Sequence, residues 1–189
     1  MEDYEELYNL YRSKYYNACN EVNACERAIA TMQEQRRSTV NRINEINARV
    51  KKTNGAISNM QSVLNREDEV TEKLTEVSNK LDLASVNYSG MVSSSDVSNK
   101  NLTDMFSGET TATGTAINSV FDTVRSRKAS LETTVFDMQT ELNNANYELS
   151  GIDSRIRSEK SSLSEWKREK NNSYYYMEYY KRKMQETDW

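Results

Sequence analysis

The sequence predicts an all-α protein, an elongated antiparallel helical hairpin or coiled coil with a short helical, loop-rich segment in its middle. First, the 189 residues include no proline and five glycines, so residues that interrupt helices are scarce. Second, 36% of the residues are hydrophobic and 29% are charged, which suits thin helices that bury one stripe better than a layered core. Third, apolar residues recur every seven positions in both terminal thirds of the chain.

The first third carries a heptad repeat, whose positions a and d form one apolar stripe along a helix. We call this stripe the seam. It predicts a helix over about residues 3–65, because a period of about 3.5 residues keeps one stripe facing a partner. Arg36, Thr39 and Thr53 interrupt the apolar pattern. The a positions are Tyr8, Tyr15, Val22, Ile29, Arg36, Ile43, Val50, Ile57 and Leu64, and the d positions are Tyr4, Tyr11, Ala18, Cys25, Met32, Thr39, Ile46, Thr53 and Met60.

The last third repeats this pattern without a slip and predicts a helix over about residues 115–187, with Thr115 as its cap. The a positions are Phe121, Lys128, Val135, Leu142, Leu149, Ile156, Leu163, Lys170, Met177 and Met184. The d positions are Ile117, Val124, Leu131, Met138, Ala145, Ile152, Glu159, Trp166, Ser173 and Tyr180.

Between these repeats the pattern weakens. The frame slips near residues 65–68, which indicates either a bend or a stammer in a continuing helix. A shorter helix over about 68–88 is predicted from Val70, Leu74, Val77, Leu81, Ala84 and Tyr88. Residues 89–114 are rich in Ser, Thr, Asn and Gly, so we expect a loop there with a short helix inside it, and a single elongated domain over 1–189.

The tyrosines favour pairing of the two long helices within one chain. Ten of the twelve fall in two windows, residues 4–16 and 174–180. If the chain folds back near residue 95, facing residue numbers add up to about 190, and both windows reach the same end. We therefore expect Tyr11 near Tyr179 and Tyr15 near Tyr175. The same register places Arg36 near Glu159.

Lys128 is likewise expected near Glu67 or Asp68. The alternative is a parallel homodimer, which would set Arg36 against Arg36 of the second copy.

Composition excludes several functions. The net charge of −4 and the absence of an extended basic patch argue against a nucleic-acid partner. No apolar stretch approaches the roughly 20 residues of a membrane span, and the acidic N-terminus does not resemble a signal peptide, so we expect a cytoplasmic protein. Without histidine we expect no metal site, no cofactor and no enzyme. Cys19 and Cys25 are expected to be reduced structural thiols.

Several tyrosines lie off the seam, where a pair of helices has no interior for their rings. They are either an ordinary amphipathic surface or a site for a partner protein. The candidate partner-binding residues are Tyr16, Tyr174, Tyr175, Tyr176, Met177 and Tyr179.

The layout resembles small helical proteins of bacterial type VII secretion, the WXG-type proteins and, more closely, the LXG-associated α-helical (Lap-type) accessory proteins. In those families a W-x-G turn links two antiparallel helices. Phe106-Ser107-Gly108 is a degenerate candidate for this turn and Tyr88-Ser89-Gly90 a second, although neither contains Trp. Tyr174 and Glu178 match the family's helical Tyr-x-x-x-Asp/Glu export signal.

The resemblance implies a targeting partner that binds the N-terminal LXG domain of a toxin and helps to present it to the secretion machinery. It further implies a second small helical partner, a location in the bacterial cytoplasm, and export together with the toxin. Two alternatives stay open. One is a generic coiled-coil scaffold or homo-oligomeric tether. The other is a prefoldin-like holdase, although residues 89–114 lack the alternating apolar strands of that fold.

Overall fold

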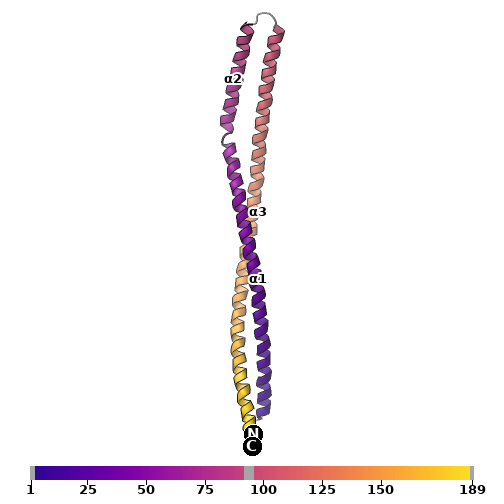
Figure 1. Cartoon of the computed structure of the whole chain (residues 1–189), viewed down its shortest axis with the longest axis vertical. Coiled ribbons are helices and arrows are strands. Elements are labelled where there is room, and N and C mark those ends of the chain that lie inside the picture. Colours follow the sequence, from indigo (N-terminus) through magenta and orange to yellow (C-terminus); the bar gives the residue numbers. More distant parts are fainter. Residues whose placement is uncertain (1–2, 92–95, 188–189) are drawn as a thin grey trace. The chain divides into compact units, whose positions relative to one another are not determined.

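The computed structural model describes residues 3–91 and 96–187, and it is built from three helices. They are α1 (Tyr4–Leu64), α2 (Glu67–Met91) and α3 (Asp96–Thr187). Within the described residues there is no strand. The predicted all-α helical hairpin is therefore confirmed, with α1 and α2 on one arm and α3 on the other (Figure 1).

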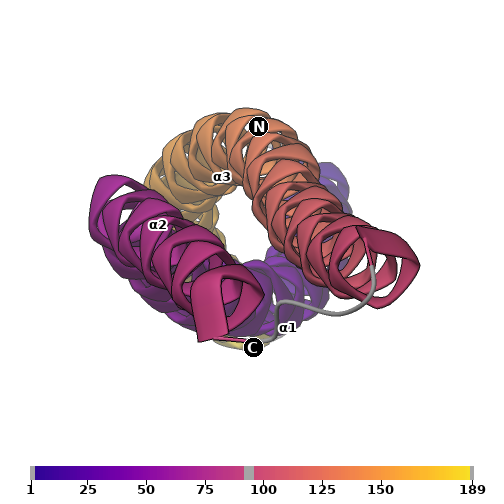
Figure 2. The same cartoon turned by 90° about the horizontal axis from the view of Figure 1, so that it is seen from above.

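Contacts divide the chain into two units. The first consists of Met1–Ile46 with Glu141–Trp189, and the second of Asn47–Thr140. In the first unit the start of α1 lies beside the end of α3, so the two helices run antiparallel (Figure 1). In the second unit the end of α1 and then α2 run alongside the first half of α3 (Figures 1 and 2).

The seam of the first unit is confirmed, because every buried side chain there occupies a predicted a or d position. The tightest places hold small residues, with Ala18, Ala145 and Ser173 each 0% exposed. Small residues let the two backbones approach each other, and larger neighbours such as Ile152 then fill the space between. The buried residues are Ala18, Val22, Cys25, Ile29, Thr39, Ile46, Ala145, Ile152, Ile156 and Ser173.

The predicted register is correct, but several individual partners differ by about a turn. Tyr15 contacts Tyr174 and Arg36 pairs with Asp153, so facing residue numbers do add up to about 190. The predicted partner Glu159 is wrong for Arg36. The guanidinium Nε lies 2.7 Å from Asp153 Oδ1, because an exposed side chain on the seam turns to the carboxylate flanking it.

The second unit is packed less tightly. Only Phe121 and Met138 are buried among its described side chains, and the other apolar a and d residues are half-buried. The two arms lie close together at Gly114, where a Cβ atom would stand 3.2 Å from Cδ2 of Leu74. Leu74 is a d residue and Gly114 an a residue, so the register of this unit is that of an antiparallel coiled coil.

The predicted bend at residues 65–68 is present, but the predicted slip of the frame is wrong. Four of the half-buried residues of α2, Glu67, Leu74, Ser78 and Leu81, continue the frame of α1, and Val70 is half-buried beside it at the position before a. Val77 and Ala84, expected on the seam, are exposed. Leu64 and Glu67 therefore stay on the same face although the helix is interrupted between them.

The interruption is a tight turn. The Arg66 amide donates to the Val63 carbonyl (3.1 Å), an i to i+3 bond, and the Val70 amide then donates to the Arg66 carbonyl (3.0 Å) to open α2. Three acidic residues, Glu67, Asp68 and Glu69, occupy the first turn of α2, where negative charge favours the helix dipole.

The cation that pairs with Glu67 was predicted to be Lys128 and is instead Arg125. Lys128 bonds Glu132 one turn along its own helix, at 2.7 Å. The long lysine stem covers the seam while its charge reaches the helix surface, so no carboxylate on the facing helix is required.

The prediction of a loop over 89–114 is wrong for the described residues 89–91 and 96–114, because α2 continues to Met91 and α3 begins at Asp96. Residues 92–95 lie outside the described residues. The hydrogen bonds of the threonine hydroxyls show why this polar segment can be helical. Thr110, Thr111 and Thr113 donate to the carbonyls of Phe106, Ser107 and Glu109, each at 2.8 Å. Thr115, expected as a cap, makes the same kind of bond to Thr111. Side chains bonded within the helix in this way no longer favour a turn.

A crosslink tests the register. With Cys19 and Cys25 changed to Ala, the pair Tyr11→Cys and Tyr176→Cys should react with a short bis-maleimide within one chain, because the two rings stack at 4.9 Å. The control pair Tyr11→Cys and Tyr147→Cys should not react within a chain, since its members lie many turns apart. Products that join only two chains would contradict the hairpin and favour the parallel homodimer.

Glycine replacements test whether residues 104–114 are helical. A Cβ at Gly55 or Gly108 meets nothing within 4 Å, so Gly55→Ala and Gly108→Ala should each raise the free energy of unfolding by about 0.5–1 kcal/mol. Gly114→Ala is the matched comparison. It should raise the free energy of unfolding by less, because the Leu74 side chain must shift to make room for the new Cβ atom. Denaturant unfolding followed by circular dichroism measures all three. A loss of stability in Gly108→Ala would show that this position is not helical.

Candidate partner-binding site

A cluster of tyrosine rings lies at the end of the first unit where α1 begins and α3 ends. Its inner rings are the seam residues Tyr4, Tyr11 and Tyr180, and Tyr176 stacks on them from outside the seam. Tyr11 stacks on Tyr176 with ring centroids 4.9 Å apart and on Tyr180 at 5.7 Å. Tyr4 stacks on Tyr180 at 6.3 Å. Tyr179, the predicted neighbour of Tyr11, does not stack on it; it lies between the two observed partners in sequence and contacts Tyr180.

The outer rings are held against this stack but remain open to solvent. Tyr179 meets Tyr180 edge-on at 5.1 Å, and Tyr175 meets Tyr176 edge-on at 5.4 Å. We call the outer rings the tyrosine face, and they are Tyr16 (56% exposed), Tyr174 (50%), Tyr175 (62%), Tyr176 (42%) and Tyr179 (41%). All five are residues that the sequence placed off the seam.

On α1, Tyr15 holds a second group of rings, with Tyr174 and Tyr16 as its partners. Its ring lies 5.5 Å from Tyr174, rather than on the predicted Tyr175, and 5.6 Å from Tyr16. Cations also contact the rings, with Arg12 5.9 Å from the ring centre of Tyr16 and Lys14 5.1 Å from that of Tyr11. These cations were not predicted from the sequence, although Arg12 lies four residues before Tyr16 on one helix, a spacing that brings the two side chains together.

The remaining predicted site residues are dispersed. Met177 is half-buried at its a position, so it belongs to the seam and not to the tyrosine face. Tyr174 and Glu178 lie one helical turn apart on α3. Phe106 and Gly108 lie within α3 in the second unit, and Tyr88-Ser89-Gly90 falls in the last turns of α2, so neither candidate W-x-G segment forms a turn.

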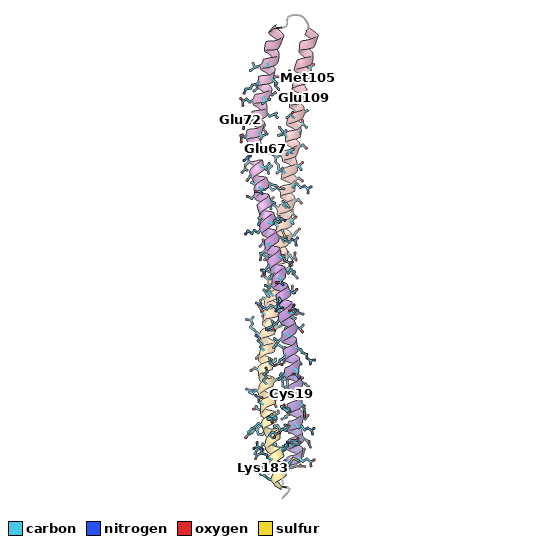
Figure 3. The ribbon with its side chains drawn as sticks, in the orientation of Figure 1. Cys19, Glu67, Glu72, Met105, Glu109 and Lys183 are labelled. Carbon is cyan, nitrogen blue, oxygen red and sulfur yellow. The ribbon has the colours of Figure 1, made fainter. Side chains whose placement is uncertain are left out.

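The two cysteines are free thiols. Cys25 is buried against Glu159, and the hydrogen bond to this carboxylate, together with burial, raises the pKa of the Cys25 thiol. Cys19 is half-buried nearer the tyrosines (Figure 3), and its hydrogen bond with Tyr15 raises the pKa of the Tyr15 phenol. Both shifts favour the neutral forms, the Cys25 thiol and the Tyr15 phenol.

The part of the chain that the structure describes contains no group of three or more His, Cys, Asp or Glu residues placed to hold a metal ion. Among the described residues, no helix is long and apolar enough to cross a membrane.

Comparison with protein-family models finds no matching family, and comparisons with curated proteins and with solved structures find no match either. The protein is therefore classified by its architecture. It is an antiparallel helical hairpin with an exposed aromatic face near the paired ends of its arms.

The buried thiol gives a pH dependence. The folded state holds the Cys25 proton to higher pH than the unfolded state does, so its contribution to stability is lost as pH rises past the ordinary cysteine pKa of about 8.5. We expect the melting temperature to fall as the pH rises above about 8.5, and to fall less in Cys25→Ala. Glu159→Gln should also reduce the fall, because it removes the carboxylate that holds the proton. An equal fall in all three proteins would contradict this assignment.

Proposed function

We propose that this protein is a helical accessory that docks onto another helical protein through its tyrosine face. In its specific form, the partner is the N-terminal LXG domain of a toxin, which the accessory helps to present to the type VII secretion machinery, with a second small helical protein in the same complex. The observation that carries the proposal is the exposure of five clustered tyrosine rings on a rigid base.

Tyrosine is well suited to docking. Each ring offers a large contact area with few rotatable bonds, and its hydroxyl keeps it compatible with water before the partner arrives. The inner stack of Tyr4, Tyr11 and Tyr180 already limits the motion of the outer rings, so little conformational entropy remains to be lost on binding. Aromatic residues at the centre of interfaces often cost about 2 kcal/mol or more when truncated.

The finer assignment to type VII secretion is supported by two features. Tyr174 and Glu178 share a continuous helix at a spacing of one turn, as the export signal of the resembled families requires. The paired long helices agree with the architecture of the Lap-type proteins. The Phe106-Ser107-Gly108 segment lends no support, because it is helical.

The alternatives are a homo-oligomeric tether and a prefoldin-like holdase. A tether would use the tyrosine face for copies of itself. A holdase of the prefoldin type needs a β-hairpin region between its long helices, and the described residues contain no strand. Neither alternative accounts for a matched Tyr174–Glu178 pair beside the exposed rings.

The test is co-purification with an LXG-domain protein encoded beside this chain. Replacing Tyr16, Tyr175 and Tyr179 with Ser should weaken the complex by about thirtyfold or more, because about 2 kcal/mol or more is lost at an interface centre. Tyr176 is left in place because its ring stacks on Tyr11. Titration calorimetry measures the affinity, and circular dichroism should show unchanged helix content.

Tyr147→Ser is the matched control. Tyr147 is 84% exposed in the first unit and lies far from the tyrosine face along α3, so its replacement should leave the affinity unchanged. Equal affinity of the triple variant and the unaltered protein would remove the tyrosine face as the docking site. A stable homo-oligomer that ignores the LXG-domain protein would favour the tether.

A further inference from the structure

The second unit has an apolar surface that the seam does not use. It lies at the heptad position just before a, named g. On α1 and α2 the successive g residues are Val63, Val70 and Val77, and on α3 they include Phe106 and Val120. We call these five residues the valine edge. Val63, Val77 and Val120 are 45%, 51% and 59% exposed, and Val70 and Phe106 are half-buried.

The register brings the five residues to one side of the helix pair. In an antiparallel coiled coil the g residues of both helices flank the same edge of the seam, and the e residues flank the other edge. The first unit shows the rule directly, because Arg42 at a g position pairs with Glu141 and Glu148, the g residues that face it. The approach of Leu74 to Gly114 sets the equivalent register in the second unit. It places Val120 beside Val63 and Val70, and Phe106 beside Val77.

The opposite edge of the second unit is polar. Its e residues include Gln61, Asp68 and Thr75 on one arm and Asn118 and Arg125 on the other. Valines at g, but polar residues at e, widen the apolar face of the arm formed by α1 and α2 beyond its a and d positions, and α3 adds Phe106 and Val120 at g, whereas its other g residues there, Thr113, Arg127 and Thr134, are polar. Such a face exceeds the two-residue seam of a helix pair and is typical of helices in bundles.

The seam beneath the valine edge is also incompletely covered, since its a and d residues, Phe121 and Met138 excepted, are at best half-buried. A helix placed along the edge would shield both the valines and the half-buried seam. The seven-residue spacing of Val63, Val70 and Val77 matches a helix that follows the same supercoil, and a β-strand offers no such period.

The charged residues beside the valine edge indicate the charge of the helix that would bind there. A row of basic residues, Arg66, Lys73 and Lys80, lies at the c positions beside the valines on α2. Lys73 and Lys80 pair with Glu69 (2.5 Å) and Glu76 (2.7 Å) on their own helix. These pairs are exposed and contribute little to stability, so the lysines can turn to a partner's carboxylates. A second copy that packed α2 against α2 would bring two basic rows together.

We infer that the valine edge binds one amphipathic helix of a different protein, with acidic residues along the flank that meets Arg66, Lys73 and Lys80. The inference is independent of the proposed function, because the valine edge belongs to the second unit and the tyrosine face to the first.

The probe is a synthetic helix of about four heptads, with Leu and Ile on its seam and Glu at its e and g positions, whose like charges oppose self-association. The full-length protein should bind this acidic peptide by fluorescence anisotropy. It should bind at least about tenfold less tightly to the same peptide with Lys in place of Glu, because close like charges oppose docking.

Variants locate the binding. Val63→Ser, Val77→Ser and Val120→Ser together should weaken acidic-peptide binding at least about tenfold, since each removes apolar area from the contact. Lys73→Glu with Lys80→Glu should reverse the peptide preference. Leu83→Ser with Met105→Ser is the control, because both side chains are exposed on outer faces (Met105 in Figure 3), and it should bind like the unaltered protein.

Circular dichroism confirms that each variant remains helical. The inference is overturned if the valine variant binds as tightly as the control, or if both peptides bind equally well. It is also overturned if sedimentation shows a dimer of the unaltered protein that the valine variant abolishes, because a second copy would then cover the edge. The Tyr16, Tyr175 and Tyr179 variant should retain acidic-peptide binding, which separates this result from a failure of the tyrosine face.

Discussion

The packing of a residues against d residues in one antiparallel register constrains everything else in this protein. Where small residues face the partner helix, as at Ala18, Ala145 and Ser173, the helices come close and the seam is fully buried. That register also decides which rings stack inside the tyrosine cluster and which remain outside it. Because side chains on a helix are fixed in direction by their place in the repeat, the positions of Tyr175 and Tyr179 follow from the burial of Ser173 and Tyr180.

The edges of the seam differ in composition between the two units. In the first unit, charged pairs cover both edges, with Arg42 and Glu148 on one and Glu26 and Lys167 on the other. Such exposed pairs add little energy, but they leave no apolar edge for a further helix. In the second unit, valines replace the charges on one edge and the core beneath is only half-buried.

The heptad repeats predicted both long helices, the hairpin register and the off-seam tyrosines, because seam periodicity depends on local spacing that the sequence displays directly. Two predictions failed for physical reasons. The threonines near Gly114 suggested a loop by composition, yet their hydroxyls bond to carbonyls one turn back and remain compatible with a helix. Val77 seemed to belong to the seam because it is apolar, whereas Ser78 keeps the frame and is half-buried. Predicting which rings stack, as Tyr176 does on Tyr11, requires the directions of the side chains, and the spacing of residues in the sequence does not give these directions.

The contacts of the tyrosine cluster join residues from opposite ends of the sequence, as in the stack of Tyr4 on Tyr180. Leu74 and Gly114 meet across a much shorter loop, so closing their contact costs less chain entropy. During synthesis the second unit can therefore pair first, while the tyrosine face cannot form until the ribosome has added the last turns of α3. A polypeptide that terminates early would fold its central helices and still fail to display that surface. The tyrosine face can therefore form only after residue 180 has been translated.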